Sequence, residues 1–224
     1  KEGVVIHLKA VAGGAFYTTD LVVSNTGGDA AFTVKFLGHD ADGRPGPEAT
    51  YALGAGKTLL LADVLGSALG VGSAWGALQV RATSAALEVR GETSTPAPAC
   101  VGGTFGQSVP AVAAASLVGP GSRRSIPGVR ESAAFRTNLV LANGSEAAAE
   151  VGVSLVLGDG TEAASRSYRV EPLGMIQVTR VVRDLGWAGD VLAGRLVVAP
   201  SSGSVAVYAS VIDNLTNDPR TLLP

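Results

Sequence analysis

The two halves of this 224-residue sequence resemble each other, and this internal repeat constrains the fold more than any local pattern does. The segment TTDLVVSN at residues 18–25 matches RTNLVLAN at residues 136–143, an offset of 118 residues. Two more blocks match in the same order: YALGAGKTLLLADVLGSALG (51–70) with YRVEPLGMIQVTRVVRDLGW (168–187), and GALQVRATSAALEVRGET (76–93) with GRLVVAPSSGSVAVYASV (194–211). Because the offsets are 117 or 118 residues throughout, we infer a duplicated module rather than one large fold.

Each copy shows the period-2 pattern of half-buried β-strands. Phe32, Val34 and Phe36 alternate with polar residues in copy one, and Val151 and Val153 alternate in copy two. Turn-rich segments such as NTGGDA and HDADGRPGP separate the runs. The strands expected in copy one are residues 4–10, 20–25, 32–37, 49–53, 58–62, 78–82 and 87–93. This spacing predicts an all-β chain of two tandem immunoglobulin-like β-sandwich domains that arose from an internal duplication.

A short helical turn is expected in each copy, at residues 63–69 and 179–185, where apolar residues fall three and four apart after a residue that can cap a helix. This turn would bridge the two sheets of a sandwich. Between the copies, Pro, Gly and Ser are frequent over about residues 94–122, which indicates a linker with FGQSVPAV inside it as a possible extra strand. The predicted domains are therefore residues 1–108 and 109–224.

The composition argues against several classes of protein. Hydrophobic residues make up 46% and charged residues 16%, with a net charge of −2 and a pI near 5.7, so no basic surface for nucleic acid is expected. No apolar run reaches the length of a membrane-spanning helix. Cys100 is the only cysteine, so no disulfide within the chain is expected. The first residue, Lys1, fits a product whose signal peptide has been removed, although a shortened chain would begin in the same way.

Three segments together carry a family resemblance: FYTTDLVVSN, AAFRTNLVLAN and VYASVIDNLTNDP. They resemble a tandem immunoglobulin-like β-sandwich module of secreted and cell-surface bacterial proteins that has no established activity. The resemblance implies an architecture and a location outside the cell, and it implies no chemistry. Copy one ends in VRGETST where copy two has VYASVIDN, so a role for Asp213 or Asn214 does not carry over to copy one.

Catalytic residues are scarce. A Ser-His-Asp mechanism needs a histidine base, and the only two histidines are His7, within an expected strand, and His39, in the turn after another. Neither adjoins a G-x-S-x-G elbow. The acidic residues fall in turns and at outward strand positions rather than as a converging pair for glycoside hydrolysis. The chain is therefore predicted not to be an enzyme, with no catalytic residue and no cofactor.

Two acidic loops are weak candidates for a metal. HDADGRPG begins like a calcium loop with Asp40 and Asp42, but the twelfth position is Tyr51 rather than a glutamate, so a hairpin turn is the preferred interpretation. In DNLTNDP, Asp213, Asn214, Asn217 and Asp218 could offer oxygen atoms to calcium, with Asp213, Asn214 and Asp218 as the preferred candidates. Asp and Asn are also common in turns, where they bond the local backbone.

Matched polar and aromatic residues have structural and binding interpretations. Asn25 and Asn143 end matching strands, where their side chains can cap the following loop. Asn143 and Asn214 also begin N-x-S/T sequons, which we attribute to chance. Trp75 and Trp187 follow the helical turns, and burial in the core is expected in preference to stacking on a sugar.

Two functions remain open from the sequence. The first is an extracellular structural protein, a self-assembling subunit of a surface filament, sheath or adhesive stalk, in which KEGVVIHLKA, FGQSVPAV or TLLP pairs with the sheet edge of a neighbouring copy. The second is a carbohydrate- or ligand-binding accessory module of a larger secreted protein, which requires an exposed face with converging polar groups or aromatics. The expected partners are accordingly further copies of the chain, the cell surface or a glycan.

Overall fold

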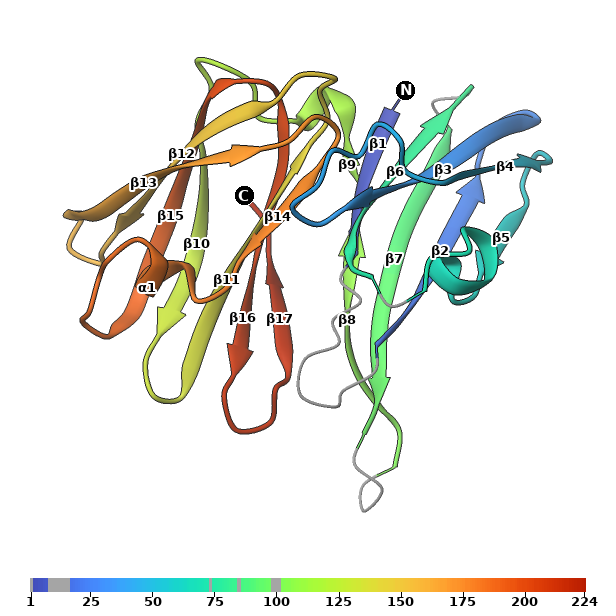
Figure 1. The fold of residues 1–224 in the computed structure, drawn as a ribbon. Helices are drawn as coiled ribbons and strands as arrows, with labels where there is room; N and C mark the ends of the chain where they lie inside the picture. Colours follow the sequence, from blue (N-terminus) through green and yellow to red (C-terminus); the bar gives the residue numbers. More distant parts are fainter. Residues whose placement is uncertain (1, 8–16, 73, 84–85, 98–101) are drawn as a thin grey trace. The chain divides into compact units, whose positions relative to one another are not determined.

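The computed structural model describes residues 2–7, 17–72, 74–83, 86–97 and 102–224 (Figure 1). The chain divides into two compact units, Lys1–Ser116 and Leu117–Pro224. All four sheets are antiparallel, two in each unit, so the chain is all-β as predicted. The division after Ser116 falls inside the segment predicted as a linker and later than the predicted boundary at residue 108.

The first unit holds strands β1 to β9 and two short helical turns. One sheet has the order β4-β3-β6-β1-β9 and the other the order β5-β2-β7-β8. The elements are β1 (Glu2–His7), β2 (Thr18–Asn25), β3 (Ala30–Gly38), β4 (Glu48–Leu53), β5 (Thr58–Leu61), η1 (Val64–Ala68), β6 (Gly76–Ala82), β7 (Leu87–Pro96), β8 (Thr104–Pro110), β9 (Val112–Ala113) and η2 (Ala114–Ser116). A strand lies at each of the seven positions predicted for copy one, although residues 8–10 of the first predicted strand lie outside the described residues.

The second unit holds strands β10 to β17 and one helical turn. Its sheets have the orders β10-β15-β12-β13 and β14-β11-β16-β17. The elements are β10 (Arg124–Glu131), β11 (Phe135–Asn143), β12 (Ala149–Val156), β13 (Glu162–Val170), β14 (Met175–Val178), α1 (Val181–Asp184), β15 (Val191–Ser202), β16 (Val205–Asp213) and β17 (Pro219–Leu222).

The strand orders of the two units correspond. Strands β1 to β8 of the first unit match strands β10 to β17 of the second unit in chain order. Under this match, the sheet order β4-β3-β6-β1 corresponds to β13-β12-β15-β10, and the sheet order β5-β2-β7-β8 corresponds to β14-β11-β16-β17. In a constant-type immunoglobulin domain the first, second, fifth and fourth strands share one sheet. Here the first strand shares a sheet with the third, fourth and sixth. The units therefore have a sandwich-like architecture, but not the immunoglobulin strand order.

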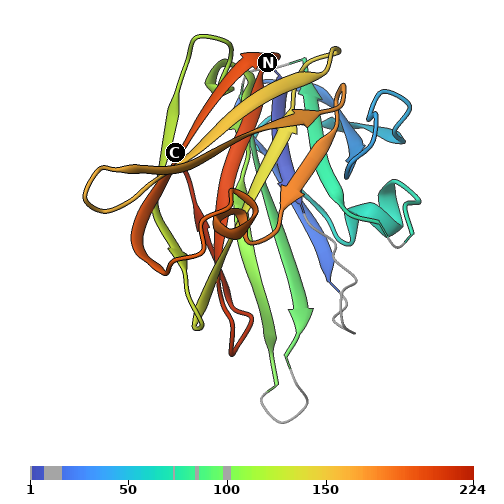
Figure 2. The same cartoon turned by 60° about the vertical axis from the view of Figure 1, so that its left-hand side comes forward.

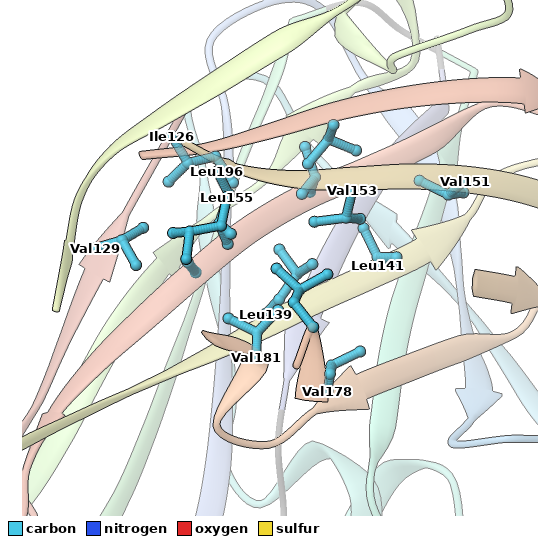
Figure 3. Packing of buried hydrophobic residues seen from close by; sticks show 14 of the residues in the cluster. Ile126, Val129, Leu139, Leu141, Val151, Val153, Leu155, Val178, Val181 and Leu196 are labelled. Atoms are coloured by element: carbon cyan, nitrogen blue, oxygen red, sulfur yellow. The ribbon is translucent and has the colours of Figure 1, made fainter. Parts of the chain in front are cut away.

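Each core forms where alternate side chains of the two sheets of a unit meet. In the first unit Leu21, Val23, Phe32, Val34 and Leu78 are at most 2% exposed. In the second unit the core draws on β10, β11, β12, β15 and β16 and on α1, as Figure 3 shows for Ile126, Leu139, Val153, Val181 and Leu196. The predicted alternation is confirmed at residues 151–153 and at 32–34, but Lys35 is only 6% exposed, so the alternation does not continue to Phe36.

Both predicted helical turns are present, as η1 and α1, and each links the two sheets of its unit. The expected side-chain cap is absent from both. Asp63 and Arg180, which precede the turns, instead adopt left-handed backbone conformations with φ of 44° and 52°. Non-glycine residues rarely adopt this conformation, which costs about 1 kcal/mol or more, so other contacts must hold it in place.

The segments predicted to pair with a neighbouring copy lie within sheets of this chain. β1 pairs with β6, β8 pairs with β7 and β17 pairs with β16. Most of the predicted linker is likewise structured, because β7 extends to Pro96 and β8 adds the next strand to its sheet. The predicted extra strand is thus confirmed. β8 and β17 each end the order of their sheet, so pairing of these segments with a neighbouring copy stays a prediction.

No helix among the described residues is long and apolar enough to cross a membrane.

Candidate functional site

The two histidines lie at or directly after the ends of β1 and β3. His7 ends β1. The imidazole of His39 stacks on the indole of Trp75, with ring centroids 3.6 Å apart and an angle of 13° between the planes. The backbone N–H of His39 also donates to the Trp75 carbonyl at 3.0 Å. These contacts use His39 to fasten the end of β3 to the chain that enters β6.

The loop that contains Asp40 and Asp42 is the hairpin connection between β3 and β4, as predicted. Asp42 accepts hydrogen bonds from the backbone N–H and the guanidinium of Arg44. The side-chain bond to Arg44, followed by the backbone bond, lowers the pKa of Asp42. Lys35 donates to the Arg44 and Gly46 carbonyls at 2.8 and 3.1 Å. The polar groups of this loop are thus engaged in holding the turn.

The calcium candidates Asp213, Asn214 and Asp218 lie in the hairpin between β16 and β17. One Asp213 carboxylate oxygen accepts from the Leu215 and Thr216 backbone N–H groups at 2.8 and 3.0 Å. These bonds, the one to Thr216 first, lower the pKa of Asp213. Across the described residues, no group of three or more His, Cys, Asp or Glu side chains could hold a metal ion. Calcium binding here stays a prediction.

Arg136 holds the same hairpin from β11. Its guanidinium donates to the side-chain oxygens of Asn214 and Asn217 at 2.8 and 3.0 Å. The Asn214 amide in turn donates to the Ala133 carbonyl at 3.0 Å. Two of the oxygens that an ion would need are therefore already bonded to a cation of the chain itself.

Asn25 and Asn143 make the same set of bonds in the two units. The Asn25 amide donates to the carbonyls of Gly28, Leu53 and Gly54, and its oxygen accepts from Gly27. The Asn143 amide donates to the carbonyls of Ala147, Val170 and Glu171, and its oxygen accepts from Ser145. Each asparagine thus joins its own loop to the end of an edge strand of the opposite sheet, β4 or β13. The predicted capping role is confirmed, and Asn143 is fully buried.

Replacing Asn143 with alanine is expected to lower the free energy of unfolding of the second unit by about 2 kcal/mol, because buried backbone groups lose their partners. Asn143→Asp should destabilise as well, since a carboxylate cannot donate to the three carbonyls. Chemical denaturation measures both changes. Asn25→Ala, the equivalent change, should act on the first unit; a stability unchanged by either alanine variant would contradict the capping role.

A second matched pair explains how the left-handed residues are held. Asp20 accepts a hydrogen bond from the Asp63 backbone N–H at 2.9 Å, and Asn138 accepts one from the Arg180 backbone N–H at 3.0 Å. Asp20 and Asn138 occupy equivalent positions on β2 and β11. The D/N position of the repeated block is therefore an anchor for the helical turn.

Glu131 is a buried carboxylate that no motif in the sequence marks as a candidate. Its side chain is 0% exposed, and one oxygen lies 2.5 Å from Arg180 Nη2 and 3.6 Å from Arg183 Nε. The other oxygen accepts from the Thr137 backbone N–H at 3.3 Å. Arg183 also donates to the carbonyls of Trp187 and Gly189. The cluster joins β10, β11 and α1 and has the character of a structural brace.

Asp184 makes a further link between α1 and the edge strand β13. It accepts from the Tyr168 hydroxyl at 2.6 Å and from Arg166 Nη1 at 3.1 Å. Burial, followed by the bond to Asp184, raises the pKa of Tyr168 above its ordinary value. A tyrosine that holds its proton this firmly serves as a hydrogen-bond donor rather than as a base.

The tryptophans offer no flat exposed platform. Trp75 is half-buried beneath His39, and Trp187 is half-buried against the core of the second unit. The prediction of core burial is therefore confirmed only in part for both tryptophans. Cys100 lies outside the described residues.

A concave site opens instead on the second unit, with a volume of about 610 Å³. We call it the arginine cleft, because Arg123, Arg124 and Arg195 line it together with Glu162. Cross-strand pairing brings these residues together, since Val156 at the end of β12 lies opposite both Arg195 and Glu162. Ser125, Val156, Gly160 and Val197 form the rest of the lining.

The charge of the arginine cleft is unbalanced. The ion pairs found in the second unit involve other arginines, namely Arg166, Arg169, Arg180 and Arg183. Within the described residues, Arg123, Arg124 and Arg195 have no carboxylate partner. Glu162, the acidic residue of the lining, accepts a hydrogen bond from the Ser154 hydroxyl at 3.1 Å. The cleft therefore presents more positive than negative charge to solvent.

Comparison with known proteins adds no assignment: neither the protein-family models nor the curated proteins searched gave a match to this chain.

Proposed function

We propose that this chain is a non-catalytic extracellular structural protein, a self-assembling subunit of a surface filament, sheath or adhesive stalk. In this proposal its two tandem β-sandwiches come from duplication of one module. The equal strand orders and the matched bonds of Asn25 and Asn143 support the duplication. The resemblance of the repeated blocks to modules of secreted bacterial proteins supports the location outside the cell.

The way the chain uses its polar residues supports a structural role. His39, Glu131 and Asp184 each have partners that fasten one element to another, and Asp42 holds its own turn through Arg44. Catalysis instead needs groups that converge on a space where a substrate can bind. The buried polar groups described above stabilise turns and sheet edges, which is what a rigid subunit requires.

The edge strand β13 is the observation that carries the assembly proposal. It is nine residues long, contains neither Pro nor Gly, and ends the order β10-β15-β12-β13 (Figure 2, the hairpin coloured from yellow to orange). The opposite edge, β10, is interrupted by Pro127 and by Gly128 with φ of 88°, a device that discourages strand pairing. A second copy could therefore add a strand at β13.

Charge on β13 does not prevent this pairing. Arg166 and Arg169 project from the strand, but they are paired with Asp184 and with Glu150 and Glu171 of the same unit. Neutralised side chains repel a second strand less than unpaired ones do. β8 and β17 also end their sheets, but β8 contains Gly106 and Pro110 and β17 begins with Pro219. β13 is therefore the better candidate for an assembly edge.

Light scattering and negative-stain electron microscopy over a range of concentrations test the assembly. We expect the protein to form ordered oligomers, and we expect Ser165→Lys with Ser167→Lys, which adds unpaired charge to β13, to shift assembly to at least about tenfold higher concentration. The control pair, Ser122→Lys with Ser201→Lys, adds equal charge elsewhere. A wild-type protein that stays monomeric, or equal assembly of the two variants, would argue against the proposal.

A ligand-binding accessory module is the second candidate function. The arginine cleft favours it, because a concave site with several converging polar groups is the usual form of a binding site. Half-buried Trp75 and Trp187 make aromatic stacking on a sugar a poor basis for this function. Any ligand would have to be recognised by charge and hydrogen bonding instead.

A further inference from the structure

We propose that the arginine cleft binds an acidic polysaccharide through the carboxylate groups of its sugars. This inference rests on the ligand-binding candidate above and does not depend on self-assembly. Its basis is the juxtaposition of Arg123, Arg124 and Arg195 in one open hollow of about 610 Å³.

The residue type fits a carboxylate. A guanidinium group is planar and can donate two parallel hydrogen bonds to the two oxygens of one carboxylate. Arg124 begins β10 and Arg123 directly precedes it, whereas Arg195 comes from β15, the next strand in the sheet. Guanidinium groups supplied from neighbouring strands can contact acid groups on successive sugars.

The remaining lining fits a sugar chain. Val156 and Val197 supply apolar surface, Ser125 supplies a hydroxyl, and Gly160 places no side chain in the turn beside the cleft. The sides of a pyranose ring are weakly apolar, whereas its rim carries hydroxyl groups. An open site of this kind can admit a segment of a long polymer without requiring its end.

Nucleic acid fits the same cleft less well. Single-stranded nucleic acid is held mainly by stacking of bases on aromatic rings, and none of the residues that line the cleft is aromatic. Double-stranded nucleic acid needs a series of cationic contacts along an extended surface, whereas this chain carries a net charge of −2. The observations therefore favour an acidic glycan.

Binding to polygalacturonate oligomers, measured by isothermal titration calorimetry at low and moderate salt, tests the inference. We expect binding that weakens with salt, and we expect Arg123→Ser, Arg124→Ser and Arg195→Ser combined to weaken it by at least about tenfold. A control triple variant, Arg90→Ser, Arg169→Ser and Arg220→Ser, removes the same charge outside the cleft and should weaken binding less than about threefold.

A variant that is expected to bind more tightly than the wild type strengthens the test. Glu162→Gln removes the carboxylate from the lining of the cleft and should tighten polygalacturonate binding about twofold to threefold. Because the altered side chains are exposed, thermal melting of each variant should match that of the wild type. A structural role for these residues would change the melting temperature and leave binding of the folded protein unchanged.

The other probes are neutral dextran, dextran sulfate and a 20-nucleotide single-stranded DNA. Their binding separates the claim that the cleft binds a ligand from the claim that this ligand is a carboxylated polysaccharide. If dextran binds at the cleft and polygalacturonate does not, the ligand-binding function stands but the assignment to acidic polysaccharides is overturned. Stronger binding of dextran sulfate or DNA than of polygalacturonate would overturn the carboxylate assignment. Loss of binding equal in the two triple variants, or no binding of any probe, would overturn the site itself.

Discussion

Leu139→Asp is expected to unfold the second unit while the first unit stays folded. Leu139 lies on β11, is 0% exposed, and is paired in register with Val178 of β14 and Ala209 of β16 within the core. An unpaired carboxylate at this position would cost several kcal/mol. A domain of this size is stabilised by only about 5–15 kcal/mol in total, so one such change is enough to remove its folded state.

Differential scanning calorimetry measures this result as the loss of one unfolding transition. The matched control is Leu21→Asp, because Leu21 holds the equivalent place on β2 and is also 0% exposed. Leu21→Asp should remove the other transition, and hydrogen exchange should assign each loss to its unit. If Leu139→Asp retains cooperative melting of the second unit, the core has been placed wrongly.

The strands of this chain could be predicted because their signals are local. Alternation at residues 32–36 and at 151–153 marks one buried face, and the repeat lets each copy support the assignment of the other. The capping role of Asn25 and Asn143 could be predicted for the same reason, since a side chain at a strand end bonds the adjacent loop.

Strand order and the candidate site depend on pairing between distant residues, which alternation does not determine. The pattern that predicts seven short strands in each copy is the same for an immunoglobulin strand order and for the observed strand order. Arg123 and Arg195 share the arginine cleft only because β10 pairs with β15, a long-range pairing that no local motif signals. The same holds for Glu131, whose partner Arg180 is 49 residues away in the sequence.

Glu131→Ala is expected to lower the free energy of unfolding of the second unit by about 3 kcal/mol, the second-largest effect among these variants. The carboxylate is fully buried, whereas the Arg180 and Arg183 side chains are 43% and 30% exposed. Removing the anion leaves two partly buried cations beside one another and frees the Thr137 N–H. The exposed parts of the arginines regain water, which keeps the cost at the lower end of the range for buried pairs.

Denaturant unfolding measures the free energy of unfolding of Glu131→Ala. The control is Glu162→Ala, because Glu162 is an exposed glutamate of the same sheet, so the difference between the two variants isolates the effect of burial. Glu162→Ala should change stability by less than about 0.5 kcal/mol.

A double-mutant cycle with Arg180→Ala should give a coupling energy of about 1 kcal/mol or more, since both groups belong to one cluster. The coupling also accounts for the left-handed backbone at Arg180: the bond to Glu131 fixes its side chain while Asn138 fixes its N–H. Independent effects of the two substitutions would mean that the contacts of Asn138 hold this turn without the carboxylate.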